Sequence, residues 1–401
     1  MKRLVFIWML LLLLGPAAAA ETKVMAVTDI HYLARPLYEG SGLFLQALKN
    51  GDGKITQYGD ELLSALYREI QSEQPDALLV TGDLSFNGEK QSHLRLADWF
   101  SRVEASGVPV WVIPGNHDIG TRPIGYTNEG GYWTDGVTAD EFREIYRDFL
   151  LPGEAGCSYA APAGEGLRVL MTDVSFCPQT FGVFTGAHSA WLSEELRKAG
   201  EAGDRVITAS HHNVVAHTDF SRDSFLMFGS EAMRALVSQA GVPLHLSGHM
   251  HIQHIAEQDD VADAATGAFC IWPHRFALVT LTDQGKLRYE ARELRDEFLP
   301  DGLKEESKAW FADIARTKSL AGLTDVPEED GRLMADLAAR FNLAYFAGTV
   351  REESAAWRED PAYRLWEACG DQGFWSYMRL VMDETEETAK TGGSHLVWEE
   401  Q

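Results

Sequence analysis

The sequence predicts an α/β fold of layered helices and strands, followed by a smaller all-α region. Between residues 24 and 247, short apolar runs alternate with amphipathic helical patterns, which is typical of α/β layers. After residue 300 the pattern becomes helical and rich in aromatic residues. The 401 residues are 45% hydrophobic and 24% charged. This composition is that of a globular protein, and the length accommodates one large or two modest domains.

Six short apolar runs predict the strands. They have few polar interruptions, as expected for strands that are buried on both faces of a sheet. The six runs are Val24–Thr28, Ala77–Thr81, Val108–Ile113, Leu167–Thr172, Arg205–Ala209 and Pro243–Ser247. Helices are predicted between them at Asp60–Gln74, Leu94–Ala105 and Ser189–Ala199, where apolar residues recur on one stripe.

The pattern changes after residue 250. Ala268–Trp272, Phe276–Thr282 and Lys286–Glu293 are predicted to be strands, and the last two form a hairpin across the turn at residues 283–285. Beyond them, Leu333, Leu337, Phe341 and Ala344 repeat at helical spacing. We therefore divide the chain into an α/β domain at residues 21–298 and a helical domain of roughly four helices at residues 299–401.

The first 20 residues read as a signal peptide. Lys2 and Arg3 precede the apolar run Leu4–Leu14, and a stretch of alanines ends at residue 20. The run is shorter than the ~20 residues of a membrane-spanning helix. We expect export to the periplasm, cell surface or exterior, with an uncleaved membrane anchor as the alternative. Export permits disulfides, and Cys157 with Cys177 is the favoured pair among four cysteines.

The net charge of −25 bears on possible partners. A chain this acidic repels polyanions, so a nucleic-acid polymer is not an expected partner. A small anionic substrate remains compatible with this charge if bound metal ions supply local positive charge.

Five polar motifs each follow the end of a predicted strand. In open α/β sheets, ligands bind beyond the carboxyl ends of the strands, so we expect the five motifs to converge on one rim. In chain order they are Asp29-Ile30-His31, Gly82-Asp83, Gly115-Asn116-His117-Asp118, His211-His212-Asn213 and Gly248-His249-Met250-His251.

These side chains suit a pair of divalent metal ions. Mixed carboxylate, imidazole and amide donors favour manganese, iron or zinc. Two cations about 3.5–4 Å apart need a bridging anion, and Asp83 is the best candidate for it. Asp29 and His31 are two residues apart on an extended segment and would hold one metal. Asn116 and His211 offer ligands to the second metal, while His249 and His251 could reach either one.

Across residues 22–295 the ordered motifs resemble those of calcineurin-like metallophosphoesterases. The resemblance implies an α/β/β/α sandwich whose metal site lies at the carboxyl ends of the strands. It implies that one metal is bound by Asp29, His31, Asp83 and His251, and the other by Asp83, Asn116, His211 and His249. His117 would contact the substrate phosphate and protonate the leaving group. The implied reaction is in-line attack on phosphorus by a metal-bridging hydroxide.

A looser resemblance points to bacterial class III cyclic nucleotide phosphodiesterases. It rests on the long insert after His31, the stretch Gly82–Glu89 with Ser92-His93, and the helical C-terminal region. Cyclic nucleotides are therefore the favoured substrates. The alternatives are a phosphomonoesterase, a phosphodiesterase acting on lipid or cell-wall head groups, and a non-catalytic binding module. The helical domain could restrict access to the site or make a dimer contact.

Overall fold

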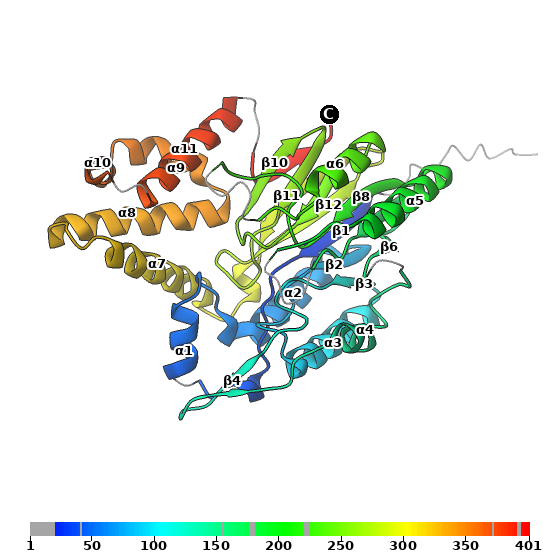
Figure 1. The fold of residues 1–401 in the computed structure, drawn as a ribbon, viewed down its shortest axis with the longest axis horizontal. Helices are drawn as coiled ribbons and strands as arrows, with labels where there is room; N and C mark the ends of the chain where they lie inside the picture. The colour runs from blue at the N-terminus through cyan, green and yellow to red at the C-terminus, as the bar shows by residue number, and fades with distance from the viewer. Residues whose placement is uncertain are drawn as a thin grey trace, which may run out of the picture.

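Two six-stranded sheets form the centre of the molecule in the computed structural model (Figure 1). The structure describes residues 21–40, 42–153, 156–175, 181–219, 225–370, 373–390 and 394–401. The predicted signal peptide and Cys177 lie outside these ranges, while Cys157 is buried. Within the described ranges, no helix combines the length and the apolar character needed to cross a membrane.

The first sheet has the order β14-β13-β12-β1-β2-β3. β1, β2 and β3 are parallel, and β12, β13 and β14 extend the sheet with antiparallel pairs. The strands are β1 (Thr22–Val27), β2 (Ala77–Thr81), β3 (Val110–Ile113), β12 (Arg275–Leu281), β13 (Leu287–Glu293) and β14 (Val397–Glu399). β14 follows all the helices of the C-terminal region, so the chain returns to this sheet at its end.

The second sheet has the order β10-β11-β9-β8-β7-β6, with β7, β8, β9 and β11 parallel. Its strands are β6 (Tyr159–Pro162), β7 (Leu167–Met171), β8 (Arg205–Ala209), β9 (Leu244–Ser247), β10 (His254–Gln258) and β11 (Val261–Ala265). A separate hairpin consists of β4 (Ile124–Tyr126) and β5 (Gly131–Trp133).

The predicted α/β/β/α sandwich is confirmed. Along β1, Val24 and Ala26 belong to the apolar core between the two sheets, whereas Met25 and Val27 face the core beneath the helices on the outer side. The helices on the outer side of the first sheet are α2 (Gly59–Glu73), α3 (Lys90–Ala105) and α4 (Ala139–Ile145). Those covering the second sheet are α5 (Gly186–Ala202) and α6 (Ser230–Gln239). Burial on both faces explains why the strands read as uninterrupted apolar runs.

The structure differs from the sequence predictions in three places. Ala268–Trp272 is a buried turn and not a strand. The strand in this region is β11, where Asp263 interrupts the apolar pattern. Its buried carboxylate is tolerated there because it accepts hydrogen bonds from Val214 N and Val215 N. The long insert after His31 contains a helix for which no prediction was made, α1 (Gly42–Lys49).

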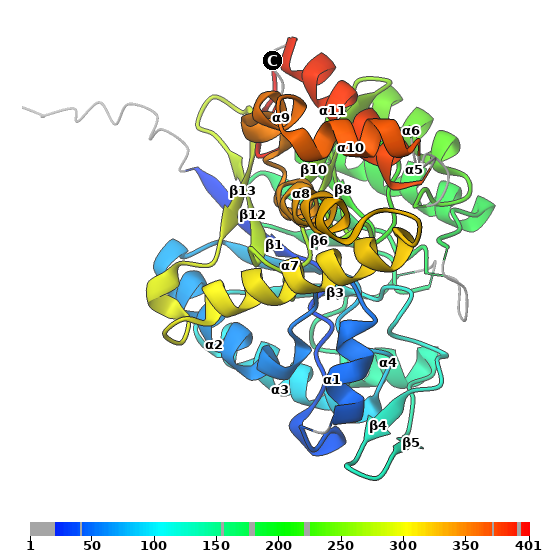
Figure 2. The ribbon, with the colours of Figure 1, turned by 90° about the vertical axis from the view of Figure 1, so that its left-hand side faces the viewer.

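In the described part of residues 303–390, five helices form the C-terminal helical region, where roughly four were expected. This region lies to one side of the sheets (Figures 1 and 2). The five helices are α7 (Leu303–Gly322), α8 (Glu328–Ala347), α9 (Val350–Arg358), α10 (Pro361–Cys369) and α11 (Phe374–Lys390). Leu337, Phe341 and Ala344 are buried as the spacing predicts, but Leu333 is 47% exposed and Met334 takes the buried place.

The helical core reaches into the last polar motif. Met250 and Ile252 pack in the same apolar cluster as α8 and α11. They alternate along the chain with His249 and His251. Neighbouring side chains of this segment therefore lie in two different environments, the apolar cluster and the polar motif. The helical region therefore anchors the loop that carries these two histidines.

Replacing Met250 with alanine should therefore weaken both stability and metal retention. Met250 is 9% exposed, and truncating a buried methionine costs about 2–5 kcal/mol. Calorimetric melting should show a lower Tm, and dialysis against a chelator should remove metal faster than from the wild type. Leu333→Ala is the matched control, since its exposed side chain contributes little. An unchanged Tm in the Met250→Ala variant would contradict this packing role.

Candidate metal centre

The polar motifs lie in the loops that follow β1, β2, β3, β8 and β9, as the sequence predicts. Several residues of these motifs have a strained backbone conformation. Asp29, His31, Asp83, His249 and His251 have φ angles of 54°, 43°, 50°, 66° and 62°, a left-handed region that non-glycine residues rarely adopt. Such strain persists only where surrounding structure enforces it, and it gathers at functional sites.

A glycine makes the convergence possible. Gly115 lies so close to Asp83 that an added Cβ would overlap the Asp83 carboxylate and its backbone nitrogen. The loops after β2 and β3 therefore touch at this point. Asp118 ties them together, because its carboxylate accepts hydrogen bonds from Leu84 N, Ser85 N and Gly115 N at 3.1, 2.9 and 2.8 Å.

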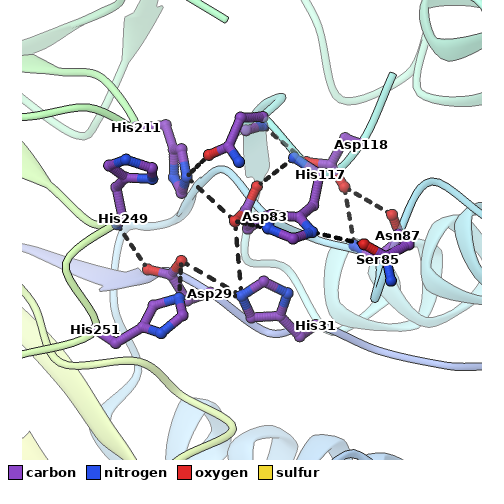
Figure 3. Close-up of polar contacts among 12 residues, drawn as sticks. Asp29, His31, Asp83, Ser85, Asn87, His117, Asp118, His211, His249 and His251 are labelled. Carbon is purple, nitrogen blue, oxygen red and sulfur yellow. Dashed lines mark hydrogen bonds and ion pairs between the residues drawn. The ribbon is translucent and has the colours of Figure 1, made fainter. Parts of the chain in front are cut away.

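One group of four side chains could hold a metal ion. Asp29, His31, Asp83 and His251 each offer a ligand atom, and these atoms all lie within 4.8 Å of one another (Figure 3). His31 Nε2 lies 3.7 Å from Asp29 Oδ1 and 3.6 Å from Asp83 Oδ2. His251 Nε2 lies 3.2 Å from Asp29 Oδ1. Together they form a compact pocket of oxygen and nitrogen donors.

The remaining predicted ligands lie on the other side of Asp83. His211 Nε2 is 3.3 Å from Asp83 Oδ2 and 3.1 Å from Asn116 Oδ1. The His249 ring centre lies 5.2 Å from that of His211, and the His249 backbone nitrogen donates to Asp29 Oδ2 at 3.1 Å. The structure thus brings all seven predicted ligands into one region, with the Asp83 carboxylate between the two groups.

The donor set fits a cation. Burial by itself raises the pKa of Asp29 and of Asp83, but the surrounding histidines hold both pKa values well below the usual range. Asp29 Oδ1 and His31 Nδ1 are buried and make no hydrogen bond within the described part of the chain. The Nε2 atoms of His31 and His251 face each other at 3.2 Å. A divalent metal binds ionised carboxylates and imidazole nitrogens. Here such groups converge in a buried place and lack a full set of hydrogen-bond donors, so a bound cation would satisfy them.

Charge coupling within the second group points the same way. Burial lowers the pKa of His211, yet the nearby Asp83 carboxylate overcomes this effect and raises that pKa to about 9. A positive charge next to Asp83 is therefore strongly favoured in this pocket, and a bound cation would meet the same field.

His117 is placed differently from the seven predicted ligands. Its side chain is 37% exposed, whereas those of His31 and Asp83 are 0% and 1% exposed. Its backbone nitrogen donates to Asp83 Oδ1 at 2.9 Å, and its Nδ1 lies 2.8 Å from Asn87 Oδ1. Nε2 lies 4.0 Å from Asp83 Oδ2. The ring is thus held at the open edge of the site.

The family models match this architecture in two places. The model described as calcineurin-like phosphoesterase matches residues 22–253, more than half of the chain. The chain belongs to the calcineurin-like phosphoesterase family. A second model, described as the C-terminal domain of cyclic nucleotide phosphodiesterase, matches residues 303–388, which include helices α7 to α10 and most of α11.

Similar curated proteins carry related names. A probable cyclic nucleotide phosphodiesterase of Synechococcus sp. strain WH7803 is 30% identical over 58% of this chain and 75% of its own length. A probable cyclic nucleotide phosphodiesterase of a second Synechococcus strain, PCC 6301, is 28% identical over 58% of this chain and 74% of its own. A cAMP/cGMP dual specificity phosphodiesterase of Mycobacterium tuberculosis is 25% identical over 56% and 64%.

Family membership determines the general activity. This calcineurin-like phosphoesterase is a hydrolase of phosphoric esters, its substrate is a small phosphoester, and its family uses divalent metals. The group formed by Asp29, His31, Asp83 and His251 is where such a metal could bind.

The sequence reasoning missed two residues that position the site of this phosphoesterase. Asn87, in the loop after β2, orients His117. Asp52 lies in the loop that follows α1, within the insert after His31. It contacts His251 Nδ1 through Oδ2, while its Oδ1 pairs with Lys54 Nζ at 2.8 Å. Burial raises the pKa of Asp52, but Lys54 and His251 hold it well below the usual range. The local sequence around residue 52 gives no indication of this contact with His251.

Replacing Asp52 with asparagine should weaken metal binding by about 10- to 100-fold, because a carboxylate on the far nitrogen of a ligating histidine sets the ring orientation and basicity. Competition with a chelator measures this affinity directly. Asp301→Asn, at an exposed position before α7, is the matched control. Equal metal affinity in the Asp52→Asn variant and the wild type would show that the carboxylate does not support His251.

Proposed function

We propose that the protein is a dinuclear-metal phosphodiesterase that hydrolyses 3′,5′-cyclic nucleotides. One observation carries the dinuclear part: a single oxygen, Asp83 Oδ2, lies 3.6 Å from His31 Nε2 and 3.3 Å from His211 Nε2. A carboxylate shared in this way by two groups of donors supports a bridging role between two cations.

The chain would hold the two ions with two groups of side chains that share Asp83. Asp29, His31, Asp83 and His251 would form the first group, and Asp83, Asn116, His211 and His249 the second. The donor chemistry suits manganese, iron or zinc. Two bound divalent cations would supply an activated water molecule for attack on phosphorus and would neutralise charge on the phosphoryl oxygens.

His117 is the residue proposed to handle the leaving group. Asn87 Oδ1 lies 2.8 Å from Nδ1, so a protonated ring held there carries its second proton on Nε2. That nitrogen lies 4.0 Å from Asp83 Oδ2, at the open edge where a phosphoester would enter. Transfer of this proton to the departing ribose oxygen is general acid catalysis.

The names of the relatives favour a cyclic nucleotide substrate. Cyclic nucleotide phosphodiesterases are named among the curated relatives, and the helical region matches a model described as belonging to that class. Hydrolysis of the cyclic diester breaks one P–O bond, consumes one water and yields a nucleoside monophosphate.

The test compares a diester with a monoester on the same protein. Residues 21–401 are loaded with Mn²⁺ and assayed with 3′,5′-cyclic AMP, methyl p-nitrophenyl phosphate and p-nitrophenyl phosphate. We expect cyclic AMP to be converted to AMP and the diesters to be preferred over the monoester. A clear preference for p-nitrophenyl phosphate would replace this proposal with a phosphomonoesterase. No turnover despite two bound metal ions would favour a binding module.

A further inference from the structure

A cavity lies between α2 and α3, the neighbouring helices on the outer side of the first sheet (Figure 2). Its volume is about 630 Å³, within the range of small-molecule sites. Side chains three or four residues apart on each helix share one face, and the segment after His31 contributes the rest of the wall. The wall includes Ser64 and Tyr67 on α2, Arg95, Trp99 and Arg102 on α3, and Arg35. We call it the arginine cavity.

The charge of the arginine cavity differs from that of the whole chain. Arg35, Arg95 and Arg102 line it, and within the described ranges none of them forms an ion pair with a carboxylate. Two carboxylates, Asp60 and Asp98, also line it, so positive side chains outnumber negative ones there. The chain as a whole carries a net charge of −25. A guanidinium group that holds no carboxylate has paired N–H donors to offer to an anionic ligand.

The arginine cavity lies apart from the candidate metal centre. Tyr32 lines the cavity, and its hydroxyl donates to Asp60 Oδ1 at 2.7 Å. The preceding residue, His31, instead places Nε2 3.6 Å from Asp83 Oδ2. These two consecutive side chains therefore serve the cavity and the centre separately. Among the described residues that line the cavity there is no candidate metal ligand, and His117 is not one of them. A ligand bound here would not occupy the centre.

Aromatic rings form a second part of the wall. Tyr67 and Trp99 are half-buried and pack against the core beneath the helices, which holds their rings in place. Burial and Asp60 raise the pKa of the Tyr32 hydroxyl, while the Arg95 guanidinium acts in the opposite direction. The Arg95 charge therefore lies close to the Tyr32 ring. Flat bases stack on aromatic rings and on guanidinium planes, so the cavity offers both stacking surfaces and phosphate donors.

We propose that the arginine cavity binds a nucleoside monophosphate at a site separate from the metal centre. The guanidinium groups of Arg95 and Arg102 would bind the phosphate, since arginine recognises phosphate oxygens with paired hydrogen bonds. The base would stack on Trp99 or Tyr67. A single phosphate suits the small excess of positive charge in the cavity, whereas the acidic chain around it repels a polyanion. This assignment goes beyond the proposed reaction and does not depend on it.

Photolabelling tests where such a ligand binds. The metal-loaded chain of residues 21–401 is irradiated with a subsaturating concentration of 8-azidoadenosine monophosphate, and mass spectrometry of its peptides identifies the labelled segments. We expect label in α2 or α3, at residues 59–73 or 90–105. Excess AMP should abolish this label. Adenosine and inorganic phosphate should each compete at least tenfold less well than AMP, because each supplies only half of the recognised groups.

Three variants of the cavity and one control complete the test. Arg95→Gln and Arg102→Gln each remove one guanidinium group, and Ser64→Phe fills the cavity. Arg68→Gln, at an exposed position of α2 outside the cavity, is the matched control. Labelling of α2 and α3 should fall about tenfold in the three cavity variants and stay unchanged in the control. Label confined to other segments, cavity variants labelled like the wild type, or adenosine that competes as well as AMP overturns the assignment.

Discussion

Replacing Asp83 with alanine should abolish both metal retention and turnover. Its carboxylate is 1% exposed and lies between His31 and His211. Without it, the two groups of donors lose the carboxylate that they share, and two cations placed close together would repel each other. We expect kcat/KM to fall on the order of 10³-fold or more, because the loss exceeds that of a single transition-state donor.

Metal analysis and kinetics on the same sample make the result specific. The Asp83→Ala protein, dialysed against metal-free buffer, should keep less than one metal ion per chain and should not regain activity when Mn²⁺ is added back. Asp301→Ala, which removes one exposed carboxylate, should behave as the wild type. Circular dichroism shows whether the variant is folded. A folded Asp83→Ala protein with two tightly bound metals and full turnover would eliminate the bridging role.

Replacing His117 with alanine should separate chemistry from metal binding. His117 is proposed as a general acid and not as a ligand, so the variant should keep its metals while kcat for cyclic AMP falls by about 10²- to 10⁴-fold. The loss should depend on the leaving group. p-Nitrophenolate departs without a proton far more readily than a ribose oxygen, so methyl p-nitrophenyl phosphate should lose much less activity than cyclic AMP.

Asn87→Ala provides the graded comparison. It removes the side chain that orients the His117 ring but leaves the imidazole, so its effect on cyclic AMP should be in the same direction and smaller. If His117→Ala loses its metals, or if both substrates lose activity equally, the role of His117 is in ligation or packing and the proton-transfer assignment is wrong.

The predictable part of the fold came from strongly patterned segments. β2 and β8 have the predicted bounds, and the last hairpin pairs as expected. β11 was missed because Asp263 breaks its apolar run. The burial of this carboxylate is offset by hydrogen bonds that it accepts from Val214 N and Val215 N after β8 and from Ser247 Oγ on β9. The turn at residues 268–272 was taken for a strand because its mostly buried residues have the same apolar composition as a strand.

The sequence by itself determined the seven candidate ligands and His117, because each follows a strand whose end is readable from local pattern. The tertiary structure decided what surrounds them. Asp52 meets His251 across 199 residues of sequence. Trp310 and Lys318 on α7 donate hydrogen bonds to Lys54 O and Gly51 O, on either side of Asp52. Such contacts depend on how distant elements pack, and no periodicity within either segment encodes them. The identity of the candidate ligands is therefore readable from local pattern, while the contacts that support them depend on the assembled tertiary structure.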